Sequence, residues 1–229
     1  MTTRESATVE SGNGINLDVR IYKPKPEEGN NDSTASDDHK IVVVLVHPYS
    51  VLGGCQGLMK GIARNLADQG IAAVTFDMRG VGKSTGRASI TGFSEVSDVV
   101  AVCKWSSQNL CSKRILLVGS SAGAPIAGSA VDEVDEVIGY VSLGYPFGWT
   151  ASILFGRHHK AILQSPKPKL FVMGTRDGFT SVKQLANKIK SAAGRAETHL
   201  IEGVSHFQME GPTYDAEMAN LIVTFISSL

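Results

Sequence analysis

The chain has 229 residues, no net charge at neutral pH and 42% hydrophobic residues, and this length suits a single domain, residues 1–229, with a sizeable core. The balanced charge favours neither a nucleic acid nor an anionic membrane as partner, and no apolar run approaches the roughly 18 residues of a membrane span. The three cysteines lack metal-ligand spacing and the first residues lack a signal-peptide core, which predicts a cytoplasmic protein with reduced thiols.

The first part of the chain predicts a hairpin followed by a loop. Residues Thr8–Glu10 and Ile15–Tyr22 flank the turn sequence Ser-Gly-Asn-Gly, which is typical of an antiparallel hairpin at a sheet edge. Residues 24–40 combine Pro, Glu, Asn, Asp and Ser with almost nothing to bury. We therefore expect a long mobile surface loop there.

From residue 41 onward, apolar strand patterns alternate with helix patterns. The strand patterns are short apolar runs without polar alternation, typical of strands covered on both faces. The predicted strands are Ile41–His47, Ile71–Asp77, Arg114–Gly119, Val137–Leu143, Leu170–Gly174 and Thr198–Glu202. The predicted helices are Gly57–Gln69, Phe93–Asn109, Ala122–Val134, Ser181–Ala193 and Thr213–Ser227. This alternation predicts right-handed crossovers and an α/β fold with an open, mostly parallel, doubly wound sheet.

The connection between the fourth and fifth of these strands is aromatic and longer than usual. We expect residues 145–167 to form a small cap over the end of the sheet, either a flap or one short helix, but not a separate lid domain. His158 and His159 within it are expected to be solvated or to cap a helix. Aromatic residues of this segment can line a substrate pocket, although packing onto the sheet explains each of them at least as well. The candidate pocket residues are Phe147, Trp149 and Phe155.

The sequence Gly119-Ser-Ser-Ala-Gly123 is the most informative feature of the chain. It matches G-x-S-x-G between a predicted strand and a predicted helix, which is the context of a nucleophile elbow. The flanking glycines let the backbone bend sharply and clear the space around Ser121. Its hydroxyl would then lie at a helix N-terminus, which favours developing negative charge. The alternative is an ordinary Gly/Ser turn, because so short a pattern also occurs by chance.

A serine hydroxyl needs a base to remove its proton and a third group to orient that base. Asp177 and His206 each follow one of the last two predicted strands, which gives the chain order Ser, acid, His, one of the orders in which such triads occur. Alternatives remain for both residues: Asp177 can cap the next helix, and His206 can be a surface histidine. Other acidic residues that can supply the carboxylate are Asp132, Asp135 and Glu136.

The tetrahedral intermediate of acyl transfer needs two hydrogen-bond donors for its oxyanion. The backbone N–H of Ala122, directly after the candidate nucleophile, is expected to be the first. The second is expected from the loop His47–Gly54, which His47 itself is expected to support. Because Pro48 has no N–H, Tyr49 is the expected donor and Ser50 the alternative.

With these motifs the chain resembles the α/β-hydrolase superfamily, and within it the compact, lid-poor serine hydrolases of carboxylesterase or dienelactone hydrolase type. The likeness runs from about residue 15 to residue 226 and includes Asp77-Met-Arg-Gly-Val-Gly-Lys-Ser84, similar to the D-x-R-G-x-G-x-S turn of many members. It implies an eight-stranded sheet whose second strand is antiparallel, helices on both faces and a minimal cap. It also implies the triad Ser121–Asp177–His206. Pro48 departs from the pattern, because many relatives have Gly there.

The expected function is therefore hydrolysis of small acyl esters through an acyl-enzyme, without metal or organic cofactor. Thioester or peptide cleavage needs the same machinery, and a fold does not fix its substrate. A receptor that retains the pocket with slow or no turnover, or a scaffold, would be an alternative of another class. The end of a phosphate-binding loop is similar to Gly82-Lys-Ser84, but Asp77 stands where that motif requires its first Gly, which argues against nucleotide hydrolysis.

Overall fold

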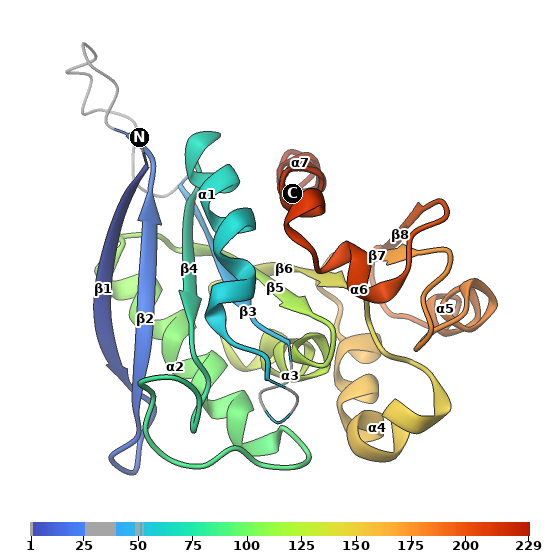
Figure 1. Ribbon diagram of the computed structural model, residues 1–229, viewed down its shortest axis with the longest axis horizontal. Coiled ribbons are helices and arrows are strands. Elements are labelled where there is room, and N and C mark those ends of the chain that lie inside the picture. The colour runs from blue at the N-terminus through green and yellow to red at the C-terminus, as the bar shows by residue number, and fades with distance from the viewer. Residues whose placement is uncertain (1, 26–39, 49–50, 52) are drawn as a thin grey trace.

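The computed structural model describes residues 2–25, 40–48, 51 and 53–229 (Figure 1). Within these residues, eight strands form one sheet in the order β1-β2-β4-β3-β5-β6-β7-β8. The strands are β1 (Thr3–Glu10), β2 (Asn16–Lys23), β3 (Ile41–Val46), β4 (Ala72–Phe76), β5 (Arg114–Ser120), β6 (Val137–Leu143), β7 (Lys169–Gly174) and β8 (Ala196–Ile201). The helices are α1 (Lys60–Asp68), α2 (Phe93–Asn109), α3 (Gly123–Ala130), α4 (Trp149–Gln164), α5 (Val182–Ile189), α6 (His206–Met209) and α7 (Asp215–Ile226), with 3₁₀ turns η3 (Gln56–Met59), η4 (Val131–Glu133) and η5 (Pro212–Tyr214).

Only β2 runs against the other strands of this sheet. It pairs antiparallel with β1 on one side and with β4 on the other, whereas every neighbouring pair from β4 to β8 is parallel. The predicted doubly wound sheet with an antiparallel second strand is thus confirmed. Because parallel strands end on the same side, the loops after β3 to β8 meet at one edge.

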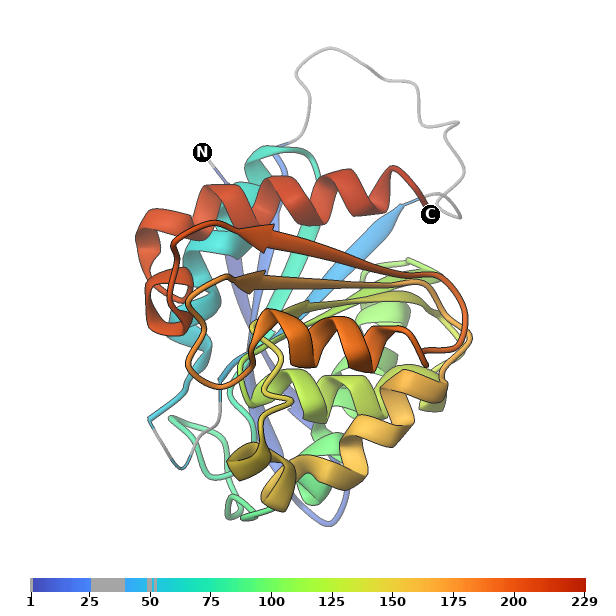
Figure 2. The same ribbon diagram turned by 90° about the vertical axis from the view of Figure 1, so that its right-hand side faces the viewer.

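Helices cover both faces of the sheet. Helices α1 and α7 pack on one face and α2 to α5 on the other, and Figure 2 shows α7 and α5 on opposite sides of the strands. In β3, Val42 and Val44 face the core under α2 to α5, while Val43 and Leu45 face the core under α1 and α7. Both faces are buried, which explains why the strand patterns lack polar alternation.

Residues 145–167 form mainly a crossover helix, the second of the two forms expected for this segment. Helix α4 is 16 residues long and packs beside α3. It buries Phe155, His158 and Ile162, whose i, i+3, i+7 spacing makes one helical face. The helix stops just before Pro166, because the residue that precedes a proline is disfavoured in the helical conformation.

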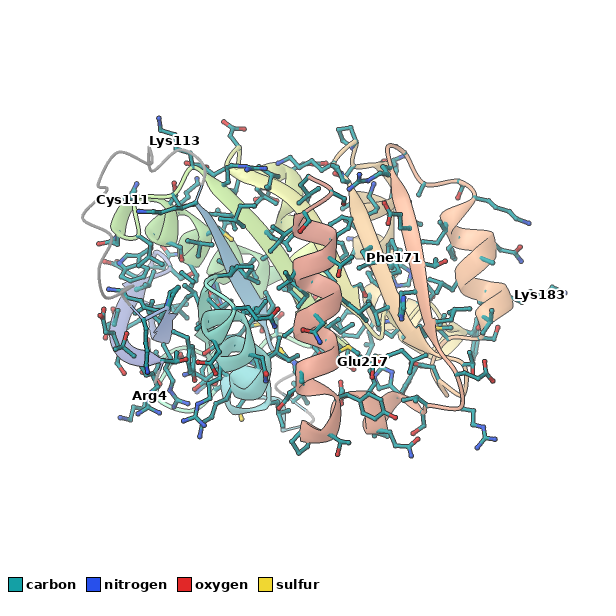
Figure 3. All side chains as sticks on the ribbon, turned by 90° about the horizontal axis from the view of Figure 1, so that it is seen from above. Arg4, Cys111, Lys113, Phe171, Lys183 and Glu217 are labelled. Carbon is teal, nitrogen blue, oxygen red and sulfur yellow. The ribbon has the colours of Figure 1, made fainter. Side chains whose placement is uncertain are left out.

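An aromatic cluster joins the start of this segment to the sheet. Phe171 of β7 is buried and lies within the body of the molecule, whereas Lys183 of α5 reaches the surface (Figure 3). The ring of Phe171 is 5.7 Å from that of Tyr145 and 5.8 Å from that of Phe147, between centroids. Tyr145 and Phe147 are themselves stacked at 4.1 Å. These rings therefore stabilise the core rather than a surface pocket.

Both histidines of α4 are buried, so the expectation that they are solvated is wrong. His158 contacts Ser129 Oγ through Nδ1 at 2.6 Å and the Thr91 carbonyl through Nε2 at 2.7 Å, which joins α4 to α3 and to the loop before α2. His159 packs edge-on against Tyr145 and Phe147. Its burial lowers the pKa of its imidazole from 6.5 to about 4, so His159 is neutral near neutral pH.

Replacement of His159 by phenylalanine should flatten the acid dependence of stability. The pKa of His159 is 6.5 in the unfolded chain and about 4 in the folded protein. Between these two pH values the unfolded chain therefore binds a proton at His159 and the folded protein does not. Stability from this residue is therefore lost as the pH falls from 6.5 towards 4. Urea unfolding at pH 7 and pH 4.5 should show a smaller loss in His159→Phe than in the unsubstituted protein. Equal losses in the two proteins would contradict this account.

None of the helices in the described ranges is both long and apolar enough to cross a bilayer.

Candidate active site

Three side chains meet at the edge where the parallel strands end. Ser121 follows β5, Asp177 follows β7, and His206 begins α6 after β8. The Nε2 atom of His206 is 2.7 Å from Ser121 Oγ, and its Nδ1 atom is 2.6 Å from Asp177 Oδ2. The side chains of His206 and Asp177 are 2% and 0% exposed. The structure thus brings the three candidate catalytic residues into one hydrogen-bonded chain.

Ser121 adopts a strained backbone conformation. Its φ is +51°, a region that costs a residue with a side chain on the order of 1–3 kcal/mol. Two hydrogen bonds hold it there: its N–H donates to the Leu143 carbonyl at 2.8 Å, and its carbonyl accepts from the Ala124 N–H at 2.9 Å. Such strain is typical of functional sites. It presents the hydroxyl at the turn between β5 and α3.

The two oxygens of Asp177 have separate partners. Oδ1 accepts the backbone N–H groups of Phe179 at 2.7 Å and Thr180 at 3.0 Å, while Oδ2 faces His206. Asp177 therefore stabilises its own turn and also orients the histidine, so the two interpretations of this residue are compatible. The alternative carboxylate of Asp132 instead accepts a hydrogen bond from Ser165 Oγ at 2.8 Å.

The surroundings of His206 fix the position of its proton. Because an ionised carboxylate only accepts hydrogen bonds, Nδ1 carries the proton beside Asp177 and Nε2 presents its lone pair to the Ser121 hydroxyl. Gly144, with φ +71°, leaves room for this ring, since a Cβ there would lie 2.9 Å from His206 Cε1. The imidazole is therefore placed to accept the proton of Ser121.

A mostly apolar cavity of about 580 Å³ opens directly beside Ser121. Its walls come from the loop after β3, the loop before α2, the first turns of α4 and the loops around Asp177 and His206. Several of the side chains at this opening are large, apolar and exposed. They are Val51, Leu58, Ile90, Leu154, Phe179 and Phe207. The cavity thus suits the apolar part of a small molecule whose reacting group lies at Ser121.

Some of the residues predicted for the pocket and the oxyanion site line the cavity, and others do not. Phe155 and Ala122 line the cavity. Phe147 and Trp149 are not among its lining residues, because Phe147 belongs to the buried aromatic cluster and Trp149 is 78% exposed at the start of α4. Their placement in the pocket is therefore wrong. The two candidates for the second oxyanion donor, Tyr49 and Ser50, lie outside the described residues.

The start of the oxyanion loop is anchored by His47. Its buried ring accepts the Met78 N–H through Nε2 at 3.1 Å, so Nδ1 carries the proton and donates to the Pro48 carbonyl at 2.5 Å. Burial lowers the pKa of His47, which keeps the ring neutral. This geometry agrees with a supporting role for His47 rather than a catalytic one.

Glu210 is a site residue that the sequence reasoning missed. Its Oε1 atom is 3.6 Å from His206 Nε2, and the residue lines the cavity. Burial raises the pKa of this carboxyl. The only available signal was the i, i+4 spacing from His206, which has meaning only on a helix. The sequence patterns placed His206 in a loop, so neither helix α6 nor Glu210, which follows its last residue, was predicted.

The part of the chain that the structure describes contains no group of three or more His, Cys, Asp or Glu residues placed to hold a metal ion.

Comparison with known proteins assigns the chain to a family. A family model described as an alpha/beta hydrolase domain matches residues 41–225, which include Ser121, Asp177 and His206. The chain belongs to the alpha/beta hydrolase family. The resemblance inferred from the sequence is thus confirmed at the level of family and fold.

Several solved structures superpose over nearly the whole chain. A serine hydrolase homologue from Coxiella burnetii is 27% identical, with a TM-score of 0.75 over 98% of this chain and 97% of that chain. A lid-less serine hydrolase from Xanthomonas campestris is 23% identical, with a TM-score of 0.75 over 98% and 95%. Est1E from Butyrivibrio proteoclasticus, solved with ferulic acid, is 18% identical, with a TM-score of 0.76 over 97% and 100%. The lid-less neighbour agrees with the absence of a separate lid domain from the described residues.

In this alpha/beta hydrolase, Gly123→Ala should disturb the contact between the elbow and the oxyanion loop. A Cβ at Gly123 would lie 2.1 Å from the His47 carbonyl oxygen, so one backbone must move. A misplacement of about 1 Å costs catalysis roughly 10²-fold, which ester kinetics can measure. Gly156→Ala is the matched control, because a Cβ there meets nothing within 4 Å. Similar activities of the two variants would contradict the proposed coupling of elbow and loop.

Proposed function

We propose that this alpha/beta hydrolase is a serine esterase that cleaves small acyl esters through an acyl-enzyme. One observation carries the proposal: the hydrogen-bonded chain from Ser121 through His206 to Asp177 opens onto an apolar cavity. A binding protein would need the cavity but not a base 2.7 Å from a strained serine. The arrangement therefore favours catalysis over recognition alone.

The geometry supports a two-step reaction. His206 Nε2 takes the hydroxyl proton of Ser121 as Oγ attacks the ester carbonyl, and Asp177 stabilises the resulting imidazolium. The Ala122 N–H is the proposed first donor to the oxyanion. When the tetrahedral intermediate collapses, the alcohol leaves with the proton from His206. Water then loses a proton to His206 and attacks the acyl-enzyme. His206 returns that proton to Ser121 Oγ as the bond between Oγ and the acyl carbon breaks and the carboxylic acid leaves.

The cavity supports a preference for short or slender acyl groups. Its volume of about 580 Å³ is bordered by Phe155, Phe179 and Phe207, which can contact an aryl or short alkyl chain. The structural neighbour Est1E was solved with ferulic acid, an aromatic acid. Thioesters of the same acids need the same steps, so they belong in the same substrate series.

A fluorophosphonate probe combined with a substrate series tests this proposal. The intact protein is incubated with the probe, and the modified residue is mapped by mass spectrometry. Ethyl esters and thioesters from acetyl to decanoyl, with an aryl series, are assayed alongside. We expect modification at Ser121 and faster turnover of the shorter or aryl esters. Modification at another residue, or labelling without turnover of any ester, would reject the esterase.

A further inference from the structure

Among the described residues, one acidic residue, Glu210, lines the cavity beside the proposed nucleophile. Among the described lining residues, only Ser121 and Glu210 have polar side chains, and the rest are apolar or glycine. Glu210 follows α6, whose first residue is His206, so it approaches the same atoms as the proposed base. Glu210 therefore offers a polar group of the substrate one place to bind in an otherwise apolar cavity.

The Oε1 atom of Glu210 is buried without a hydrogen-bond partner among the described residues. Native proteins rarely retain such an atom, because an unpaired buried acceptor is costly. Burial also raises the pKa of the Glu210 carboxyl, an effect that the neighbouring His206 and Ser121 offset only in part. A positive charge bound in the cavity beside this carboxyl would stabilise its ionised form.

The described part of the chain does not supply that charge. No Lys or Arg of the described residues forms an ion pair with Glu210. The nearest basic atom, His206 Nε2 at 3.6 Å, presents its lone pair in the resting state and does not donate. The rings of Phe179 and Phe207 also line the cavity, and aromatic faces attract cations.

We propose that Glu210 selects esters that carry an ammonium group a few bonds from the scissile carbonyl. The carboxylate binds the ammonium, the carbonyl lies at Ser121, and the apolar remainder of the substrate contacts the phenylalanine side chains of the cavity. Glu210 is thus a specificity residue that acts on binding rather than on proton transfer. This inference rests on the proposed esterase function and names its substrate class.

Two matched ester pairs test the role of Glu210. Ethyl 4-aminobutanoate is compared with ethyl pentanoate, which places the charge on the acyl side, and 3-aminopropyl acetate with butyl acetate, which places it on the alcohol side. We expect kcat/KM to favour the ammonium member of one pair at least tenfold, and Glu210→Gln to abolish that preference. Glu202→Gln, which removes an exposed charge near the same loop, should retain it.

The outcomes separate this inference from the esterase proposal. Hydrolysis of the neutral esters without preference for an ammonium group would overturn the role of Glu210 alone. Equal changes for both members of a pair in Glu210→Gln would also overturn it, since they would indicate an effect on His206. Calorimetric titration with n-butylammonium and with 1-butanol needs no turnover. Tighter binding of the cation that Glu210→Gln abolishes supports the inference, and equal binding of both rejects it.

Discussion

Replacing Ser121 with alanine should lower kcat for ester hydrolysis by about 10⁶-fold, because it removes the hydroxyl that lies in hydrogen-bond contact with His206 Nε2. The change removes one oxygen and leaves the backbone of the elbow in place. Steady-state assays with a short ethyl ester and circular dichroism measure activity and fold together. We expect the fold to be retained while labelling by the fluorophosphonate probe disappears.

The same prediction extends to a double variant. Residues of one catalytic unit act together. The kcat of the double variant Ser121→Ala, His206→Ala should therefore lie within about tenfold of the kcat of either single variant. Ser120→Ala is the matched control, since this neighbouring serine is buried in β5 and does not line the cavity. If the two replacements multiplied their effects, Ser121 and His206 would not act in one mechanism.

Elements that bury apolar side chains could be predicted from the sequence. Helix α2 has the predicted bounds, Phe93–Asn109, and the parallel strands lie where their apolar runs indicated. Strand β1 is longer than expected. Its length is set by pairing with β2 from Thr3 to Glu10, and because most of these residues are exposed, no apolar pattern in the sequence marks where the strand begins. The full length of helix α4 was not predicted, because its buried face includes His158 and His159, which composition assigns to solvent.

The convergence of Ser121, Asp177 and His206 could also be predicted, whereas the cavity could not. Parallel strands end at one edge, so chain order alone places these residues together. The cavity walls come from segments distant in the sequence, such as those carrying Leu58 and Ile90, and their meeting depends on how the whole chain packs. Glu210 belongs with these residues, since its role depends on a four-residue helix that no periodicity reveals.

Asp177→Asn should lower kcat by about 10⁴-fold while leaving the fold intact. The amide oxygen of asparagine can continue to accept the N–H groups of Phe179 and Thr180, as Asp177 Oδ1 does. The NH₂ group then faces His206 Nδ1. Because NH₂ donates hydrogen bonds, Nδ1 must present a lone pair to it instead of a proton. The imidazole proton must move to Nε2, and the ring can no longer accept the proton of Ser121.

Kinetics and unfolding measured on the same samples distinguish this tautomer effect from simple loss of structure. Urea midpoints of Asp177→Asn and of the unsubstituted protein should agree closely, because the hydrogen bonds of the turn survive. Asp132→Asn is the matched control, since its carboxylate accepts from Ser165 Oγ and should tolerate an amide with nearly unchanged kcat. A large loss of activity in Asp132→Asn with little loss in Asp177→Asn would transfer the orienting role to the other carboxylate. A low urea midpoint in Asp177→Asn would instead show that its capping of the turn matters more than its contact with His206.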